Sequence, residues 1–144
     1  MSKIEQSQDE ASSILHETLF ISTFIIKERK TRYLNLLSSK KGRAKFRMQI
    51  PHSLTLDLNV KYLHKIKNSD QNVLFILNKL REYSSSNLCY VMAEHSKYDQ
   101  KYMQIDDALK ALFSCGIGYI ISCIPGRLLY FEAENNNERY FLHA

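Results

Sequence analysis

A proline–glycine pair in the last third of the chain constrains the fold more than any other feature of the sequence. Pro125 and Gly126 separate two segments that are rich in β-branched and aromatic residues. Proline presets φ for the second position of a β-turn, and glycine accepts the positive φ that a type II turn needs at the third. The sequence therefore predicts a β-hairpin, with strands at about 117–123 and 128–133.

A second hairpin is predicted to follow the first, with a loop at 134–137 that contains three consecutive asparagines. In the resulting register, Glu132 faces Arg139 and Phe131 faces Tyr140. The opposite-charge pair and the aromatic pair then lie on opposite faces of the ribbon, an arrangement that cross-strand pairing favours. This register predicts a last strand that begins at Arg139 and ends near the C-terminus.

The segment before the first hairpin is predicted to add a strand and a helix. Residues 88–93 are apolar, as in a buried strand, and a polar loop at 94–104 separates them from a helix that begins near Asp106 and Asp107. Carboxylates are favoured at the positive end of a helix. A strand, a helix and a strand in succession usually form a right-handed parallel crossover, which is expected for residues 88–123.

Most of the chain before residue 84 is predicted to be helical. The expected helices are 9–26, 28–38, 40–50 and 70–83. The density of β-branched residues at 20–26 leaves a short strand there as an alternative, because such side chains lose χ1 freedom in a helix. Residues 54–67 are ambiguous, but alternating lysines favour an extended edge strand, since lysine discourages pairing with another chain.

Together these elements predict an α+β fold in a single domain that spans residues 1–144. Residues 1–8 are predicted to be disordered, residues 9–83 to form a mainly helical part, and residues 88–142 to form the sheet part. The N-terminal helices are expected to pack on a C-terminal four-stranded sheet, mixed or antiparallel, with the order β-α-β-β-β. A chain of 144 residues can bury about two-thirds of its unfolded surface, enough for one core.

The cysteines and the N-terminus predict a cytoplasmic protein with reduced thiols. The chain has three cysteines without paired spacing, whereas a secreted disulfide framework normally uses an even number. The N-terminus is polar, unlike a signal peptide, and the longest apolar run, at 19–26, is far too short to cross a bilayer. The sequence lacks the short cysteine or histidine spacing of a metal site and any nucleotide-binding fingerprint, so neither metal nor cofactor is expected.

One strongly basic segment is the main charge asymmetry of the chain. Residues 27–47 contain nine basic side chains and one acid, so they carry +8, and the rest of a chain whose total is +5 carries −3. Such a segment is typical of a surface that binds nucleic acid or an acidic protein. The alternative is a solvated helix face whose charges balance acidic loops of the same protein. The predicted binding residues are Lys27, Arg29, Lys30, Arg32, Lys40, Lys41, Arg43, Lys45, Arg47 and Arg127.

Cys123 is the strongest candidate for catalysis, because it lies next to the Pro–Gly turn with Arg127 just across it. A nearby cation can lower the pKa of a thiol and so activate it. A base would also be needed, and His95 follows the first predicted strand, where α/β sheets place many sites. Glu94 and Asp99 in the same loop are candidates for acid–base catalysis. The alternative is that Cys123 is a small buried apolar residue, as free cysteine usually is.

Several segments resemble a family of small bacterial proteins of unknown function. They are residues 33–46, 87–99, 103–109, 121–132 and 138–142. The most specific part is Ser122-Cys-Ile-Pro-Gly-Arg127, which is similar to the Ser-Cys-Ile-Pro-Gly-Lys/Arg hairpin motif of the family. The chain departs from the family loop at Lys97, Tyr98 and Gln100, where the family carries Glu, Leu and Gly. The resemblance implies a bacterial cytoplasmic protein but implies no reaction, cofactor or partner.

The leading functional prediction is a small cytoplasmic non-enzymatic protein that binds a macromolecule. A protein is the preferred partner, in a regulatory or toxin-neutralising role, because the chain has a charged surface but no catalytic motif. The first alternative is nucleic-acid binding through the basic helices at 27–47. The second alternative is a thiol or acid/base enzyme centred on Cys123. No contact with a membrane is expected.

Overall fold

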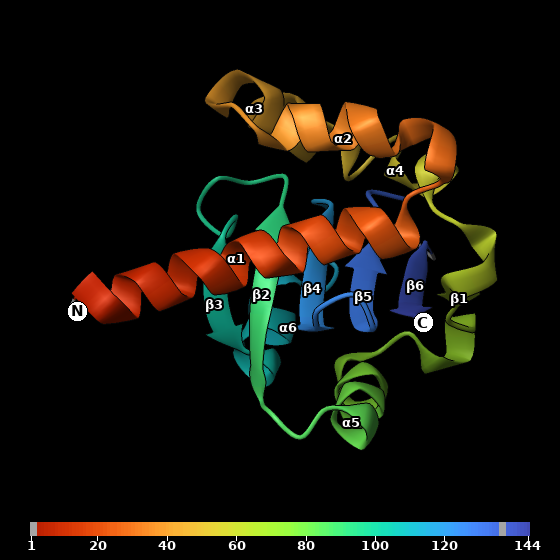
Figure 1. Ribbon diagram of the computed structural model, residues 1–144. Helices are drawn as coiled ribbons and strands as arrows, with labels where there is room; N and C mark the ends of the chain where they lie inside the picture. Colours follow the sequence, from red (N-terminus) through yellow and green to blue (C-terminus); the bar gives the residue numbers. More distant parts are fainter. Residues whose placement is uncertain (1–2, 136–137) are drawn as a thin grey trace.

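The computed structural model describes residues 3–135 and 138–144, and these form an α+β fold built on one antiparallel sheet (Figure 1). Within the described residues the sheet has six strands in the order β1-β6-β5-β4-β2-β3. Every neighbouring pair is antiparallel. The strands are β1 (Leu63–Lys65), β2 (Leu88–Ala93), β3 (Lys101–Gln104), β4 (Tyr119–Ile124), β5 (Leu128–Glu132) and β6 (Arg139–His143).

Both predicted hairpins are confirmed, and the second has the register expected from the sequence. The glycine of the Pro–Gly turn has a φ of +69°, and a backbone hydrogen bond of 3.0 Å closes the turn between β4 and β5. Between β5 and β6, Glu132 pairs with Arg139 and Phe131 pairs with Tyr140. Two of the three asparagines in the second turn lie outside the described residues.

The prediction of a four-stranded sheet with a parallel crossover over residues 88–123 is wrong. Residues 101–104 form β3 inside the expected polar loop, and β3 reverses the chain before α6 (Ile105–Leu112). As a result, β2 and β4 are antiparallel neighbours. The second added strand, β1, lies within 54–67, where the lysine pattern indicates an edge strand. Both added strands are short and polar, as edge strands often are, so they lack the apolar signal of the central strands.

The N-terminal half is helical as predicted, although its first helix is longer than expected. The helices are α1 (Lys3–Phe24), α2 (Lys30–Leu37), α3 (Lys40–Gln49), α4 (Leu54–Asp57) and α5 (Val73–Tyr83), with 3₁₀ turns η1 (Lys27–Arg29), η2 (Val60–Tyr62) and η3 (Asn68–Asp70). Residues 3–8, which the sequence predicts to be disordered, belong to α1. Extending an existing helix is far easier than nucleating one, so packing further along α1 supports these turns. Helix replaces the alternative strand at 20–26, leaving a single bridge between Ile25 and Leu58.

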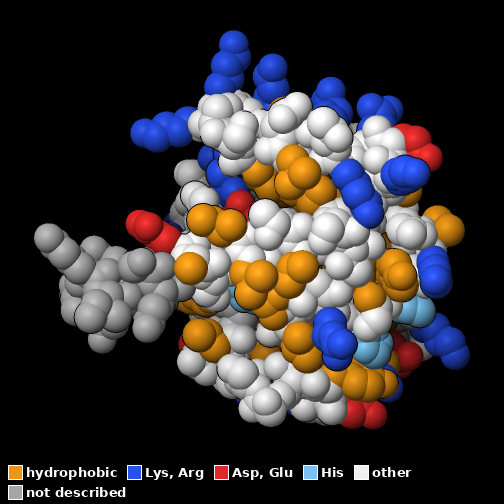
Figure 2. Space-filling model, in the orientation of Figure 1, with side chains coloured by type: hydrophobic (Ala, Val, Ile, Leu, Met, Phe, Trp, Pro, Cys, Tyr) orange, Lys and Arg blue, Asp and Glu red, His pale blue; other side chains and the backbone are white. Residues whose placement is uncertain are grey.

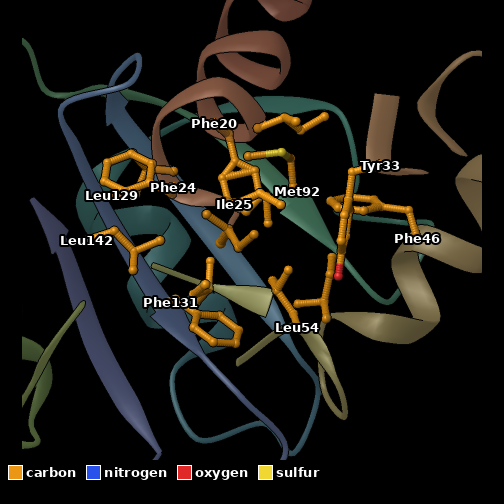
Figure 3. Packing of buried hydrophobic residues seen from close by; sticks show 14 of the residues in the cluster. Phe20, Phe24, Ile25, Tyr33, Phe46, Leu54, Met92, Leu129, Phe131 and Leu142 are labelled. Atoms are coloured by element: carbon orange, nitrogen blue, oxygen red, sulfur yellow. The ribbon is translucent and has the colours of Figure 1, made fainter. Parts of the chain in front are cut away.

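The sheet separates two hydrophobic clusters, because successive residues of a strand point to opposite faces. Tyr90 and Met92 of β2 belong to the cluster that contains Phe20 and Phe24 of α1 (Figure 3). The intervening residue Val91 belongs to the second cluster, with buried side chains of α5 and α6. In Figure 1, α1 crosses one face of the sheet while α2, α3 and α4 lie beyond one end of the strands. The predicted cover of N-terminal helices is therefore present on one face.

Candidate functional site

The basic segment 27–47 folds into η1, α2 and α3 and carries six exposed cations. Blue side chains project outward from these helices in Figure 2. The exposed residues are Lys27, Arg29, Arg32, Lys40, Lys41 and Lys45. Arg29 lies 3.6 Å from the carboxylate of Asp57, and the other five form no ion pair with any residue that the structure describes. These five cations are therefore available to a partner.

The remaining basic residues of the segment, Lys30, Arg43 and Arg47, are partly buried and bind groups of the protein itself. Lys30 Nζ donates to Ser22 O at 2.6 Å, and Arg47 Nε donates to Glu94 O at 3.1 Å. Balance by an acidic loop, as the alternative interpretation of a solvated helix face expects, is present for Arg43, which pairs with Asp99 in the loop after β2. Lys30 and Arg47 donate to backbone carbonyls instead, and the five cations without an ion pair lie on the solvated face.

Arg43 is the centre of a buried ion cluster that joins three distant segments. Its Nη1 donates to Glu17 Oε1 at 2.6 Å, while Nε and Nη2 donate to the two oxygens of Asp99 at 2.8 and 2.9 Å. The three side chains are at most 12% exposed. Burial lowers the pKa of Arg43, but the hydrogen bonds to both carboxylates outweigh it and raise that pKa above its usual range. One cation faces two anions in this set, which we call the Arg43 cluster.

Aromatic and polar side chains extend the Arg43 cluster toward the core. Tyr90 Oη donates to Glu17 Oε2, and burial together with this carboxylate raises the pKa of the Tyr90 hydroxyl. His16 stacks on Tyr90 with the ring centroids 5.2 Å apart, and its Nδ1 lies 2.7 Å from Ser122 Oγ. Burial lowers the pKa of His16 from 6.5 to about 4, so the ring is neutral at pH 7.

The loop after β2 delivers Asp99 to Arg43. Asp99 Oδ1 accepts a hydrogen bond from Ala93 N at 3.0 Å, and Gln100 N donates to Val91 O at 2.9 Å. Gln100 has a φ of +62°, in the left-handed region that residues other than glycine rarely adopt. This conformation lets the chain turn into β3 directly after Asp99. Local strain is thus tolerated next to the Arg43 cluster.

A close contact between α2 and α3 sets the position of Arg43. A Cβ atom on Gly42 would overlap with the carbonyl oxygen of Leu36, so only glycine fits at this crossing. Ser39 caps α3, because its hydroxyl accepts a hydrogen bond from Gly42 N at 3.0 Å. Arg43 follows in the first turn of α3. The lone glycine of the basic segment is therefore a packing residue.

An apolar groove lies between α1 and α2, beside the Arg43 cluster. Ile14, Leu15 and Leu34 are 62%, 49% and 47% exposed, and apolar side chains lie below the row of cations in Figure 2. A hollow of about 160 Å³ between the helices is lined by Ile14, Glu17, Thr18, Leu34, Leu37 and Ser38. A second hollow shares Ile14 and Glu17 with it. We call this surface the α1–α2 groove.

The structure does not bring Cys123 and His95 together. Ala93 at the end of β2 pairs with Tyr119 at the start of β4, so the loop after β2 lies at the opposite end of β4 from Cys123. Cys123 is 8% exposed, and burial raises the pKa of its thiol. Arg127 is exposed at the Pro–Gly turn, which packs against α1. The burial of Cys123 and the raised pKa of its thiol agree with the alternative interpretation, in which Cys123 is a small buried apolar residue.

The other catalytic candidates are engaged in local contacts. Glu94 Oε2 accepts a hydrogen bond from Gly118 N at 3.2 Å, and Asp99 is bound by Arg43. His95 is exposed, and its Nδ1 accepts from Lys97 N at 3.1 Å. These contacts hold the loop after β2 in shape, and they leave His95 without a neighbouring carboxylate among the described ion pairs.

A second arginine-centred cluster lies on the face of the sheet that α5 and α6 cover. Arg139 Nε donates to Glu132 Oε1 at 3.0 Å, and the hydroxyls of Tyr119 and Tyr130 donate to the same oxygen at 3.0 Å each. The two other guanidinium nitrogens of Arg139 donate to further side chains. We call this set the Arg139 cluster. It is an enclosed ion pair whose polar atoms are satisfied within the protein.

Sequence reasoning missed Glu17 and His16 as parts of a site. Glu17 precedes Phe20, Ile21 and Phe24 by three, four and seven residues, so it shares their face of α1. A carboxylate on the buried face of an amphipathic helix requires a cationic partner. That position is the one signal in the sequence that indicates the Arg43 cluster.

Comparisons of the chain with protein-family models, with curated proteins and with solved structures find no match. The resemblance to a bacterial family therefore stays a prediction. In the part of the chain that the structure describes, no three His, Cys, Asp or Glu side chains are placed to hold a metal ion. No helix there has both the length and the apolar character needed to cross a membrane.

Proposed function

We propose that this chain is a small, cytoplasmic, non-enzymatic protein that binds an acidic protein partner in a regulatory or toxin-neutralising role. The binding surface would consist of the α1–α2 groove and the exposed cations of η1, α2 and α3. The observation that carries the proposal is the combination of exposed apolar side chains with cations that have no ion-pair partner among the described residues.

The apolar part of this surface favours a protein partner. Protein interfaces place apolar side chains at the centre and polar ones at the rim, and exposed apolar patches rimmed by polar residues mark such sites. Ile14 and Leu34 would fill the centre, while Lys40 and Lys41 would attract acidic side chains of the partner. Long-range attraction of this kind acts mainly on the rate of association.

The location proposed for the protein rests on its thiols. The structure describes all three cysteines, and each of them is free. Free thiols are stable in a reducing compartment such as the cytoplasm. The finding supports a cytoplasmic location and is in keeping with the family resemblance.

Nucleic-acid binding is the second candidate, because Lys27, Arg32, Lys40, Lys41 and Lys45 are free to contact phosphates. Affinity would then fall steeply with salt, and replacing three of these cations would reduce the slope of log K against log salt by about 3. Apolar side chains add little to a phosphate-binding surface. The exposed isoleucine and leucines of the α1–α2 groove therefore make this candidate the weaker one.

The proposal is tested by capturing partners from lysate of the host with matched variants. Leu34→Asp places a charge in the α1–α2 groove, and Leu74→Asp places the same charge on α5, where Leu74 is 67% exposed. A true partner is lost with Leu34→Asp, retained with Leu74→Asp, and resistant to nuclease treatment. Lys40→Glu with Lys41→Glu should slow its association, most strongly at low salt.

Two outcomes contradict the proposal. Retention of every captured protein by Leu34→Asp would show that the α1–α2 groove is not used. Loss of all captured material after nuclease treatment, together with saturable binding of a duplex or single-stranded probe, would favour the nucleic-acid candidate instead.

A further inference from the structure

A small pocket lies on the other face of the sheet, between α5 and the strands at the β1 edge. It has a volume of about 170 Å³ and is lined by His64, Lys79, Tyr83, Leu128, Phe141 and His143. His64 pairs with Phe141 across β1 and β6, and Leu128 pairs with His143 across β5 and β6. Paired residues of an antiparallel sheet point to the same face, so these four side chains form one wall.

Helix α5 supplies the opposite wall of the pocket. Lys79 and Tyr83 are one helical turn apart and therefore lie on the same side of α5. The rings of Tyr83 and His143 are 4.8 Å apart, so they form an aromatic side of the pocket. Leu128, which is 2% exposed, and Phe141 supply an apolar floor.

Positive charge and hydrogen-bonding groups surround this apolar floor. Lys79 contributes an ammonium group, and the ring nitrogens of His64 and His143 form no hydrogen bond with a residue that the structure describes. None of the lining residues is acidic. Lys79 pairs at 3.4 Å with Glu82, an exposed residue of α5 that lies outside the lining.

We propose that this pocket binds a small organic anion that has one aromatic ring and one carboxylate, with benzoate as the simplest example. The floor and the aromatic side would contact the ring, and Lys79 with the two imidazoles would bind the carboxylate. A cavity of about 150 Å³ holds benzene, so a pocket of this size has room for one aromatic ring. The site lies on the opposite face from the α1–α2 groove and is independent of the proposed function.

The proposal is tested by titrating the full chain with benzoate while recording the NMR signals of the His64 and His143 rings. Benzamide keeps the ring without the charge, and acetate keeps the charge without the ring. We expect a saturable shift with benzoate and affinities at least about tenfold weaker for the two controls, a difference of about 1.4 kcal/mol. Equal binding of benzamide and benzoate, or shifts that never saturate, would overturn the proposal.

Two variants of α5 change the charge at the pocket in opposite directions. Lys79→Met removes the ammonium but keeps an apolar stem, and it should weaken benzoate binding about tenfold. Glu82→Gln releases Lys79 from its ion pair and should strengthen binding a few-fold. Lys110→Met on α6, outside the pocket, is the matched control and should change nothing. With thermal melting unchanged, an unaltered affinity in both α5 variants would refute a role for charge and hence the proposal.

Discussion

The Arg139 cluster and the Arg43 cluster show two ways of burying an arginine in the same sheet. Arg139 faces one carboxylate, Glu132, across neighbouring strands, and each nitrogen of its guanidinium donates to a side chain of the protein. Arg43 faces two carboxylates that come from separate parts of the chain. A hollow of about 300 Å³ reaches Arg43 and Asp99 from the surface. The first cluster is closed, and the second borders solvent.

The two clusters therefore differ in what they contribute: the Arg139 cluster stabilises the fold, whereas the Arg43 cluster is also accessible to a partner. A closed pair of one cation and one anion stabilises the fold and leaves no charged group to bind a partner. A cluster with an excess carboxylate beside a surface hollow is accessible to water and to a cation of a bound partner. It also lies next to the α1–α2 groove, with which it shares Glu17. The comparison therefore predicts that changes at Arg139 affect stability most.

The largest effect is expected for Arg139→Met. Removing the cation leaves Glu132, which is 2% exposed, without a counter-charge, and breaking a buried pair costs about 3–5 kcal/mol. Urea unfolding followed by circular dichroism measures this loss. Arg127→Met, at an exposed arginine, is the control and should change the free energy of unfolding by less than about 0.5 kcal/mol. A loss below about 1 kcal/mol for Arg139→Met would show that water can replace the cation and that the pair is not closed to solvent.

A smaller effect is expected for Arg43→Met, about 2–3 kcal/mol, because water from the adjacent hollow can solvate the two carboxylates that remain. Glu17→Gln should cost less than Arg43→Met, since it leaves one cation facing one carboxylate, Asp99. Both are measured by the same unfolding experiment. Equal losses for Arg43→Met and Arg139→Met would contradict the distinction between the two clusters.

The free energy of unfolding should also depend on pH through His16, which lies beside the Arg43 cluster. The pKa of His16 is about 6.5 in the unfolded chain and about 4 in the folded protein, because burial disfavours the charged ring. As pH falls, His16 is therefore protonated in the unfolded chain before it is protonated in the folded protein. The contribution of the neutral His16 ring to stability is complete above pH 6.5 and is lost as pH falls toward 4. The expected loss is about 2–3 kcal/mol. Unfolding at pH 7 and pH 4.5 should show a smaller difference for His16→Gln than for the wild type; identical differences would exclude His16 as the cause.

The smallest effect is expected at Gln100, whose φ is +62°. A left-handed conformation costs a residue with a Cβ about 1 kcal/mol, and the greater freedom of glycine in the unfolded chain offsets part of the gain. Gln100→Gly should therefore stabilise the protein by about 0.5 kcal/mol, read as a small rise in Tm. Gln100→Ala keeps the strain and should give no rise. A drop in Tm for Gln100→Gly would show that the Gln100 side chain supports the loop.

The hairpins and the helices were predictable because their signals are local. Pro125 and Gly126 fix one turn, and the loop at 134–137 sets the register that pairs Glu132 with Arg139 in the next hairpin. The strand β3 was not predictable in this way, since Lys101 and Gln104 are exposed at a sheet edge and carry no apolar pattern. Missing β3 produced the wrong parallel crossover, because one additional strand reverses the direction of everything that follows.

The candidate site was predictable only in its charge. The sequence identifies the basic segment. It does not show that Arg43 and Arg47 point into the protein, because this depends on which other elements pack against α3. Cys123 was placed correctly on its strand. Its environment depends on β2, whose antiparallel direction moves His95 to the other end of β4.

The sequence by itself determined the Pro–Gly hairpin, the cross-strand pair of the Arg139 cluster and the basic character of α2 and α3. These depend on turn geometry and on neighbours within a few residues of one another. Only the tertiary structure decided the Arg43 cluster, the α1–α2 groove and the pocket under α5. Their members come from distant segments that meet because the sheet order places their elements side by side, and the free energy of that packing belongs to the whole chain.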